Sequence, residues 1–367
     1  MLLYKGSRDQ ILAPLQSVCG IVEKRHTLQI LSNVLLEKEG DQLTLLASDL
    51  DIQIKTRTNT NESEKIALTV AARKLQDILR ALPEDSEISL NLDESRLQVK
   101  AGRSRFNLQT QPAEGFPHML LSDGNRTHLK LSQKQFKRLL ALVQYAMAVQ
   151  DVRYYLNGLL VVVRGNEICV IATDGHRLAF AKEVLDEQLP SIEVILPRKT
   201  VLELSRQLDD NDEPLEISLT PTQALFRFGS IEFVSKLIDG KFPDYDRVIP
   251  KTHDKLIKLS RAQLLQSLLR VKILTNEKTP GVRLVFGENT LKIIGNNNER
   301  EEAQEEIEID YPHETIDIGF NVNYLLDVLN HLSDEEIECH LGDTRSSALF
   351  QLPGNQNFKY VVMPMRI

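Results

Sequence analysis

The run TDGHR at 173–177 places the carboxylate of Asp174 two residues before the imidazole of His176, the side-chain types that a general acid–base pair requires. The run begins at the end of an apolar segment, ICVIATD, and two similar segments end alike: LTLLASD in Asp49 and LKIIGNN in Asn297. These polar residues recur at spacings of 125 (174 − 49) and 123 (297 − 174) residues. A polar residue that ends an apolar segment in every repeat is typical of a turn, so we predict a turn role for Asp174 rather than catalysis.

Other signatures of catalysis are missing from the sequence. No Walker, GxGxxG, GxSxG or HExxH motif occurs. Cys19, Cys169 and Cys339 lie far apart in apolar surroundings, which favours buried free thiols over a disulfide or a zinc site. The dense acidic run at 299–308 could hold metal for a nuclease, but it lies on a strand-like segment beside a like-charged turn. We therefore expect no enzyme activity, no catalytic residue, no metal and no cofactor.

Basic residues gather on predicted helices, although the net charge is −8. Five of six helix patterns carry Lys or Arg on the face opposite their apolar stripe: Arg8; Lys134, Lys137 and Arg138; Arg261, Arg270 and Lys272; Arg73, Lys74 and Arg80; and Arg198, Lys199 and Arg206. One basic helix face usually only meets solvent, but its recurrence on equivalent helices indicates a surface for DNA phosphates, which fix position and read no sequence. On this argument Arg73, Lys74, Arg80, Arg198 and Lys199 are predicted to face duplex DNA.

The elements that carry these residues repeat along the chain. Ser7, Ser132 and Ser260 each precede a glutamine by three residues, the pattern of a helix capping box, at spacings of 125 (132 − 7) and 128 (260 − 132) residues. Apolar stripes at helical spacing follow: Ile11, Leu12, Leu15, Val18, Cys19 and Val22; Phe136, Leu139, Leu140, Val143 and Met147; and Leu264, Leu265, Leu268 and Leu269. A second helix pattern follows each, at 71–82, 197–208 and 321–332, and then short alternating strands.

A chain of 367 residues is long enough for two or three domains of ~150 residues. The repeats predict an α+β fold of three similar domains, 1–126, 127–252 and 253–367, each made of two strand–helix–strands half-repeats. The hydrophobic content of 42% is that of a globular protein, and no apolar run reaches the ~18 residues of a membrane span. The N-terminus has no secretion signal, so we expect a cytoplasmic protein with no membrane partner.

Several stretches closely resemble the bacterial β sliding clamp family, the DNA polymerase III β subunit, in its proteobacterial form. They are QDVRYYLNG (150–158), ATDGHRLA (172–179), FPDYDRV (242–248), NEKTPGVRL (276–284) and YVVMPMRI (360–367). The likeness runs essentially end to end; departures are Gln29 in place of a common proline, an extra residue near the N-terminus, and Ile367 for a terminal leucine. The resemblance implies a DNA-clamp fold that forms a ring as a head-to-tail dimer, a processivity factor that encircles duplex DNA.

The resemblance also implies partners and sites. A clamp loader would open the ring, and the loader, replicative and translesion polymerases and other proteins would dock through short peptides. Arg25, Gln150, Arg153, Tyr154 and Tyr155 join the DNA-facing residues. Tyr154 and Tyr155 could equally be core residues, but the neighbouring Arg153 and a following Asn-Gly turn favour an exposed loop.

A partner-peptide pocket is implied between the second and third domains. Its residues are Leu156, Thr173, Gly175, His176, Arg177, Leu178, Pro243, Arg247, Val248, Ser347, Val361, Met363, Pro364, Met365 and Arg366. The chain ends in an apolar run, whereas most termini are polar, and methionines adapt to several ligands. The alternative is that this tail only packs into the third domain.

The dimer contact is predicted from complementary segments. Arg96, Arg103 and Arg105 lie beside the apolar Phe106 and Leu108, with Lys74 as a further member, and the third domain offers Ile273, Leu274, Glu299, Glu301, Glu302 and Glu305. Both the charges and the apolar groups match, which favours pairing. The alternative is that the glutamates only protect an exposed sheet edge. A protein-only scaffold is the competing function, and retention on circular against linear DNA would distinguish it from a clamp.

Overall fold

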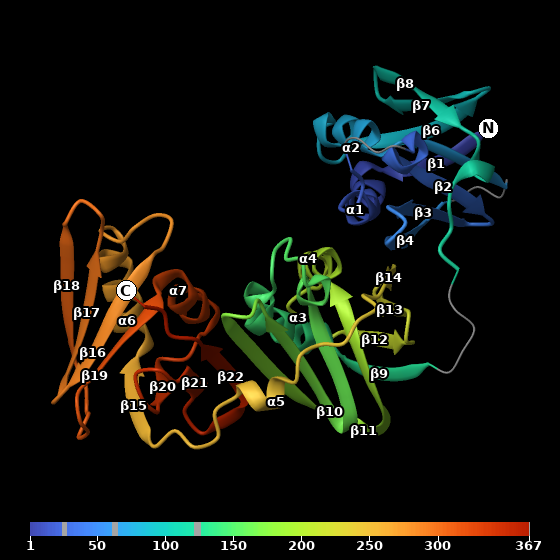
Figure 1. The fold of residues 1–367 in the computed structure, drawn as a ribbon. Helices are drawn as coiled ribbons and strands as arrows, with labels where there is room; N and C mark the ends of the chain where they lie inside the picture. Colours follow the sequence, from blue (N-terminus) through green and yellow to red (C-terminus); the bar gives the residue numbers. More distant parts are fainter. Residues whose placement is uncertain (24–27, 61–64, 121–125, 367) are drawn as a thin grey trace. The chain divides into compact units, whose positions relative to one another are not determined.

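The computed structural model describes residues 1–23, 28–60, 65–120 and 126–366. In these residues antiparallel sheets alternate with short helices, and each predicted half-repeat is a strand, a helix and further strands (Figure 1). The prediction of an α+β chain made of three similar domains is therefore confirmed.

The first domain shows the half-repeat twice. The elements of its first half are β1 (Leu2–Ser7), α1 (Arg8–Cys19), a 3₁₀ turn (Gln29–Ser32), β2 (Asn33–Glu39), β3 (Gln42–Ser48) and β4 (Ile52–Asn59). Those of its second half are β5 (Ile66–Ala71), α2 (Ala72–Ala81), β6 (Glu87–Asp93), β7 (Arg96–Ala101) and β8 (Ser104–Gln111).

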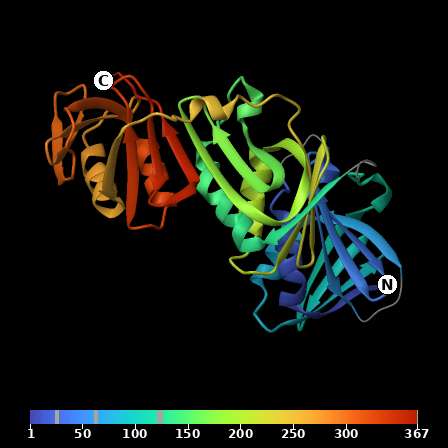
Figure 2. The same cartoon turned by 90° about the horizontal axis from the view of Figure 1, so that it is seen from below.

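The second and third domains follow the same order. The second contains β9 (Thr127–Ser132), α3 (Gln133–Val143), β10 (Gly158–Thr173), β11 (Arg177–Pro197), α4 (Arg198–Gln207), β12 (Pro214–Leu219), β13 (Gln223–Phe228) and β14 (Ile231–Lys236). After α5 (Tyr245–Val248), the third contains β15 (Lys255–Ser260), α6 (Arg261–Lys272), β16 (Gly281–Gly287), β17 (Thr290–Asn296), β18 (Glu302–Glu308), β19 (Ile316–Asn321), α7 (Val322–His331), β20 (Glu336–Leu341), β21 (Ala348–Leu352) and β22 (Asn355–Val362). The long pair β10–β11 crosses both half-repeats of its domain and is green in Figures 1 and 2.

The predicted serine caps begin three of the helices. At α3 the box is complete, because the Gln135 amide donates to Ser132 Oγ (3.2 Å) and the Ser132 amide donates to Gln135 Oε1 (2.8 Å). At α6 Ser260 Oγ accepts from the amide three residues on (3.4 Å). At α1 Ser7 Oγ accepts from the Asp9 amide (3.3 Å), so the cap is present but its box is not.

The apolar stripes of these helices face the sheets, with one correction. The predicted stripe of α3 is buried throughout, and so are Ile11 and Leu15 of α1. In α6, however, Leu269 is 41% exposed, and Val271 takes the buried place beside Leu264 and Leu268. A helix turns about 100° per residue, so Leu269 points at least about 100° away from each of Leu264, Leu268 and Val271, outside the face that they share.

Neighbouring domains are joined by strand pairing at equivalent places. In one seam β4 pairs with β14, Ile52–Lys55 against Glu232–Ser235. In the other β11 pairs with β22, Arg177–Ala181 against Phe358–Val362. By contacts the chain therefore divides into two compact units, Met1–Phe136 with Leu202–Leu237 and Lys137–Val201 with Ile238–Ile367.

Candidate DNA and partner-binding surfaces

Asp174 organises a turn between β10 and β11. Its Oδ1 accepts from the amides of His176 (2.9 Å) and Arg177 (3.1 Å). Asp49 Oδ1 accepts from the amides two and three residues on (3.0 and 2.6 Å), and Asn297 Oδ1 accepts from those two and four residues on (both 3.0 Å). The predicted turn role of the three equivalent residues is confirmed, because a short polar side chain satisfies amides that no strand partner reaches.

Arg177 leaves this turn and enters the interior of the second unit. Its Nε donates to Asp174 Oδ2 (3.1 Å), Nη1 to Asp327 Oδ2 (2.5 Å) and Nη2 to the Tyr145 carbonyl (2.6 Å). The guanidinium carbon lies 4.4 Å from the centre of the Tyr324 ring, and the side chain is 9% exposed. Every nitrogen of the guanidinium is thus engaged with the protein itself.

The apolar residues of the predicted pocket lie in one cluster. Leu156, Leu178 and Val361 are each at most 2% exposed and belong to the same group of packed side chains. Register explains the grouping: Leu178 of β11 stands opposite Thr173 of β10 on one side and opposite Val361 of β22 on the other. Three paired strands thus bring Thr173, Leu178 and Val361 together, and Leu156 joins them from the 3₁₀ turn Tyr154–Leu156.

Two further segments border this cluster. The segment that contains Pro243, Arg247 and Val248 is anchored by Phe242 and Ile249, which are buried in the cluster, while the three predicted residues are exposed. From the other side comes the tail: the Met363 amide donates to the His176 carbonyl (2.9 Å) and the Met365 amide to that of Gly319 (2.8 Å). Pro364 and Ser347 are half-buried, and Met363 and Arg366 are exposed. The tail is therefore pinned at two points while the Met363 side chain stays 50% exposed.

The sequence analysis did not predict Tyr324 and Asp327, the two residues of helix α7 that contact Arg177. A signal was present, because the helix pattern at 321–332 is the one without Lys or Arg. Its polar side chains hold a cation from another domain, which a basic helix would repel.

Two of the predicted DNA-facing arginines, Arg73 and Arg198, have structural partners, and so do Arg8 and Arg261. Arginines in the first turn of four helices donate to carbonyls in the last turn of the companion helix or within a few residues after it. The acceptors are the carbonyls of Leu82 for Arg8 (2.9 Å), Val22 for Arg73 (2.7 Å), Met147 for Arg198 (3.3 Å) and Leu329 for Arg261 (3.1 Å). A cation at a helix C-terminus is favourable, so each arginine stabilises the helix pair.

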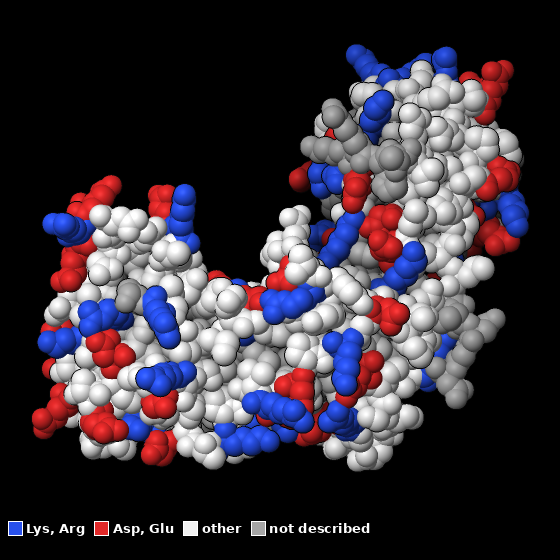
Figure 3. Space-filling view, viewed as in Figure 1, with Lys and Arg blue, Asp and Glu red and all other residues white. Residues whose placement is uncertain are grey.

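The exposed cations and the loop after α3 complete the predicted DNA set. Lys74, Arg80 and Lys199 are exposed; Arg25 lies outside the described residues. In the loop, Gln150 is exposed with φ 54°, and Tyr154 is 56% exposed while Tyr155 is half-buried against the apolar cluster. On the face seen in Figure 3, Lys and Arg are interspersed with Asp and Glu, so charges of both signs share that surface.

Arg153 is held at the base of this loop. Its Nη2 donates to Asp151 Oδ2 (2.9 Å) and to the Asp174 carbonyl (3.1 Å). Hydrogen bonds from Arg153 lower the pKa of Asp151 to about 2. The loop and the turn are therefore tied together by one arginine.

Comparison with known proteins decides the family. Sequence profiles of the DNA polymerase III beta subunit match most of the chain: the N-terminal domain at residues 4–120, the central domain at 130–244 and the C-terminal domain at 246–366. This chain belongs to the DNA polymerase III beta subunit family. The beta sliding clamp of Pseudomonas putida is 47% identical over 362 residues, 98% of each chain, and that of Escherichia coli K12 is 45% identical over 366 residues, 99% of this chain and 100% of the other.

Solved structures agree. The DNA polymerase III subunit beta of Pseudomonas aeruginosa superposes with a TM-score of 0.96 at 44% identity, and the match covers 100% of both chains. A Pseudomonas aeruginosa sliding clamp bound to griselimycin gives the same score and identity with the same coverage.

In this beta subunit family member, two strand edges carry the predicted dimer residues. β18 is the edge of the sheet β18-β17-β16-β19, and β8 touches β5 only at its end, through Thr110 and Gln111. Phe106 and Leu108 on β8 are half-buried, whereas Ile273 beyond α6 is 77% exposed and Leu274 is half-buried.

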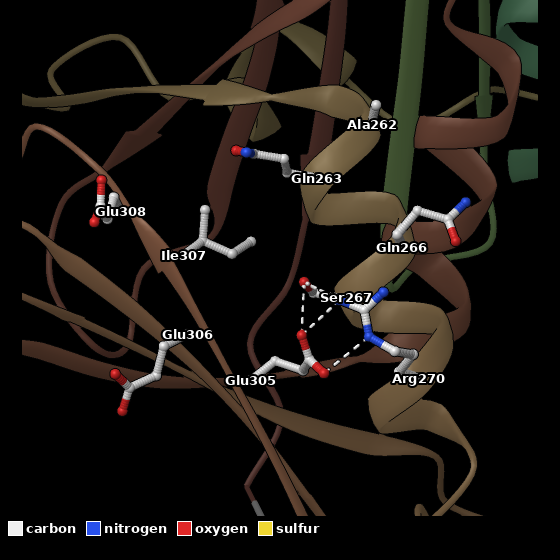
Figure 4. Close-up of a pocket in the computed structure, with 9 residues that line it drawn as sticks. All are labelled: Ala262, Gln263, Gln266, Ser267, Arg270, Glu305, Glu306, Ile307 and Glu308. Carbon is white, nitrogen blue, oxygen red and sulfur yellow. Dashed lines mark hydrogen bonds and ion pairs between the residues drawn. The ribbon is translucent and has the colours of Figure 1, made fainter.

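Charges around both edges are opposite. Arg96, Arg103 and Arg105 are exposed near β8, and Glu299, Glu301 and Glu302 are exposed at β18. Glu305 instead accepts from Arg270 Nη2 (2.6 Å) in its own domain (Figure 4). A hollow of about 570 Å³ opens beside this pair between α6 and β18, lined by Ala262, Gln263, Gln266, Ser267, Arg270, Glu305, Glu306, Ile307 and Glu308.

The remaining predictions concern thiols, metals and membranes. The three cysteines are free; Cys19 and Cys339 are buried, but Cys169 is only half-buried. Burial raises the pKa of Cys19 to about 12 and that of Cys169 to about 11, so both stay thiols at neutral pH. Among the described residues there is no group of three or more His, Cys, Asp or Glu that could hold a metal. Within the same residues, no helix is long and apolar enough to cross a membrane.

Proposed function

We propose that this chain is a DNA sliding clamp, a processivity factor in which two copies close head to tail around duplex DNA and tether the replicative polymerase. The observation that carries the proposal is the repeated seam. β4 of the first domain pairs with β14, the last strand of the second, and β11 of the second pairs with β22, the last strand of the third. The equivalent strand of the third domain, β18, is left as an edge, and the last strand of the first, β8, pairs on its outer side only through Thr110 and Gln111.

Those edges supply a third seam between two copies. If β18 of one copy pairs with β8 of the next, every domain joins its neighbour in one way, and a heterologous contact closes when its rotation fits. Opposite charges flank the edges, and Ile273 offers apolar surface beside them. Domains at 1–126, 127–252 and 253–367 would then number six in a dimer of about 83 kDa, twice 41.7 kDa. The proposed place of action is the bacterial cytoplasm, and no chemical step is assigned to the ring.

The test is topological. The protein, loaded by the clamp loader of its own organism, should stay on nicked circular DNA through a salt wash and slide off the same DNA once linearised. Ile273→Ala with Leu274→Ala should give monomers in ultracentrifugation and lose this retention. Leu256→Ala, at another exposed leucine, serves as the control. Equal retention on linear DNA would refute encirclement.

Inside the ring the exposed cations and the loop would meet phosphates without reading sequence. Lys74, Arg80, Lys199, Gln150 and the exposed Tyr154 are the side chains we place nearest DNA. Each phosphate contact that is lost should make the slope of log K against log salt concentration shallower by ~0.9.

The apolar cluster with its exposed border is the proposed docking site for partner peptides from the loader, from replicative and translesion polymerases and from other DNA-processing proteins. A peptide with a glutamine anchor followed by leucine and phenylalanine should bind in the micromolar range, roughly 8 kcal/mol. Deletion of residues 363–367 should abolish binding and polymerase stimulation but leave the dimer intact. Native affinity in the truncated protein would place the site elsewhere.

A further inference from the structure

Arg177 carries a charge that is almost removed from water. Its three guanidinium nitrogens reach Asp174, Asp327 and the Tyr145 carbonyl at 2.5 to 3.1 Å, and its plane lies over Tyr324. A guanidinium with 9% exposure is stable only where such partners replace water. No other side chain type offers this planar fork.

The partners of Arg177 come from three separate segments. Tyr145 follows α3, Asp174 begins the turn after β10, and Tyr324 and Asp327 lie on α7. Tyr324 is itself fastened, because its carbonyl accepts from Tyr360 Oη on β22 (2.9 Å). One side chain therefore ties the second domain to the third at the point where β11 and β22 pair.

The turn that Arg177 fastens supplies one side of the proposed peptide site. His176 lies on it and Thr173 directly precedes it, and the His176 carbonyl accepts from the Met363 amide, which holds the tail (2.9 Å). A shift of the turn would thus move both borders of the site. The guanidinium, however, points away into its own partners.

We infer that Arg177 is a positioning residue: it does not contact the partner peptide but latches the turn 174–177 to helix α7, so that the site is formed before a partner arrives. This inference rests on the proposed function of that site. Preorganisation raises affinity because the peptide need not order its own binding site.

The test compares Arg177→Gln, Asp327→Asn and the double variant. Asp327 is 39% exposed, so Asp327→Asn should fold. Asp327 is also not a predicted peptide contact, so a loss of affinity in this variant would act through Arg177. Each single change should weaken peptide binding by about tenfold, and the double variant should be no weaker than either, since both remove one link. Arg177→Lys should not restore affinity, because an ammonium cannot reach all the partners.

Hydrogen exchange in the peptide-free protein supplies a second readout. The amides of His176, Arg177 and Met363 should exchange faster in both single variants. Arg283→Gln is the matched control, because Arg283 pairs with Asp317 on strands β16 and β19 of the third domain (2.5 Å) and should leave binding and exchange unchanged.

Two results would overturn the latch. One is native affinity in Asp327→Asn; the other is loss of affinity in Arg177→Gln with unchanged exchange in the free protein, which would make Arg177 a direct peptide ligand. If the unmodified protein binds no peptide, the proposed docking site fails, and the exchange measurement still decides whether the latch exists.

Discussion

The turns at 49–52 and 174–177 have the same backbone hydrogen bonds, but their last residues make different contacts. In both, an aspartate after an apolar strand accepts two amides, and the next residue has positive φ, 77° at Leu50 and 89° at Gly175. The fourth residue differs. Ile52 is 1% exposed and lies in the seam with β14, whereas Arg177 is the charged link to α7. A repeated turn can therefore bury an apolar seam in one domain and position a binding surface in the next.

The second residue of the turn shows what distinguishes the two. Leu50 demonstrates that this backbone accepts a side chain at positive φ, at some cost in strain. At Gly175, an added Cβ would lie 3.0 Å from both terminal nitrogens of Arg153. A side chain at this position would therefore displace the end of the Arg153 side chain, in addition to the strain of its φ.

Exchanging these residues should give the largest effect. Gly175→Leu combines strain with overpacking against Arg153, and we expect a loss of about 2–4 kcal/mol in unfolding free energy and more than tenfold in peptide affinity. Leu50→Gly should change stability by less than about 1 kcal/mol, because relief of strain offsets loss of a half-buried leucine. Urea unfolding and peptide titration measure both.

Gly229→Leu separates strain from overpacking. Gly229 also has positive φ, 52°, but an added Cβ there meets nothing within 4 Å. Gly229→Leu should therefore lower the unfolding free energy by only about 1–2 kcal/mol, through strain alone. Equal losses of unfolding free energy in Gly175→Leu and Gly229→Leu would show that contact with Arg153 adds nothing to the cost of the substitution.

Asp174→Asn should have an intermediate effect. Asn297 makes the equivalent turn with an amide side chain, so an amide satisfies the two backbone donors. What the substitution removes is the charge that faces Arg177 Nε. We expect a loss of about 1.5–3 kcal/mol, typical of a hydrogen bond to a charged group, in urea unfolding. A change under about 0.5 kcal/mol would mean that Asp174 acts on the turn alone.

Acidification should have the smallest effect. The folded pKa of Asp151, about 2, lies below its ordinary value of about 3.9, so its stabilisation is fully present above that value and is lost only as the pH falls through about 2. Amide exchange of Asp151 and Arg153, corrected for its intrinsic pH dependence, should therefore not change between pH 7 and 5. Asp151→Asn should make these amides exchange faster throughout this pH range. Loosening of the native loop by pH 5 would contradict the link between loop and turn.

The sequence by itself determined the local features of this protein. The serine caps, the apolar stripes and the turn residues depend on groups within a few positions of one another, and periodicity reports them directly. The repeat of these local units also predicted the three-domain α+β fold. The stripe was wrong at Leu269, which lies outside the buried face of its helix.

Only the tertiary structure decided how the charges are used. Arg73 and Arg198 were predicted from the sequence to contact phosphates, yet each donates to a carbonyl a few residues after a companion helix. Arg177 was predicted to belong to the peptide pocket, yet it binds Asp327, 150 positions away. The physical reason is that a cation is stabilised by whichever acceptors surround it after burial, and those acceptors come from distant segments whose meeting no local pattern records.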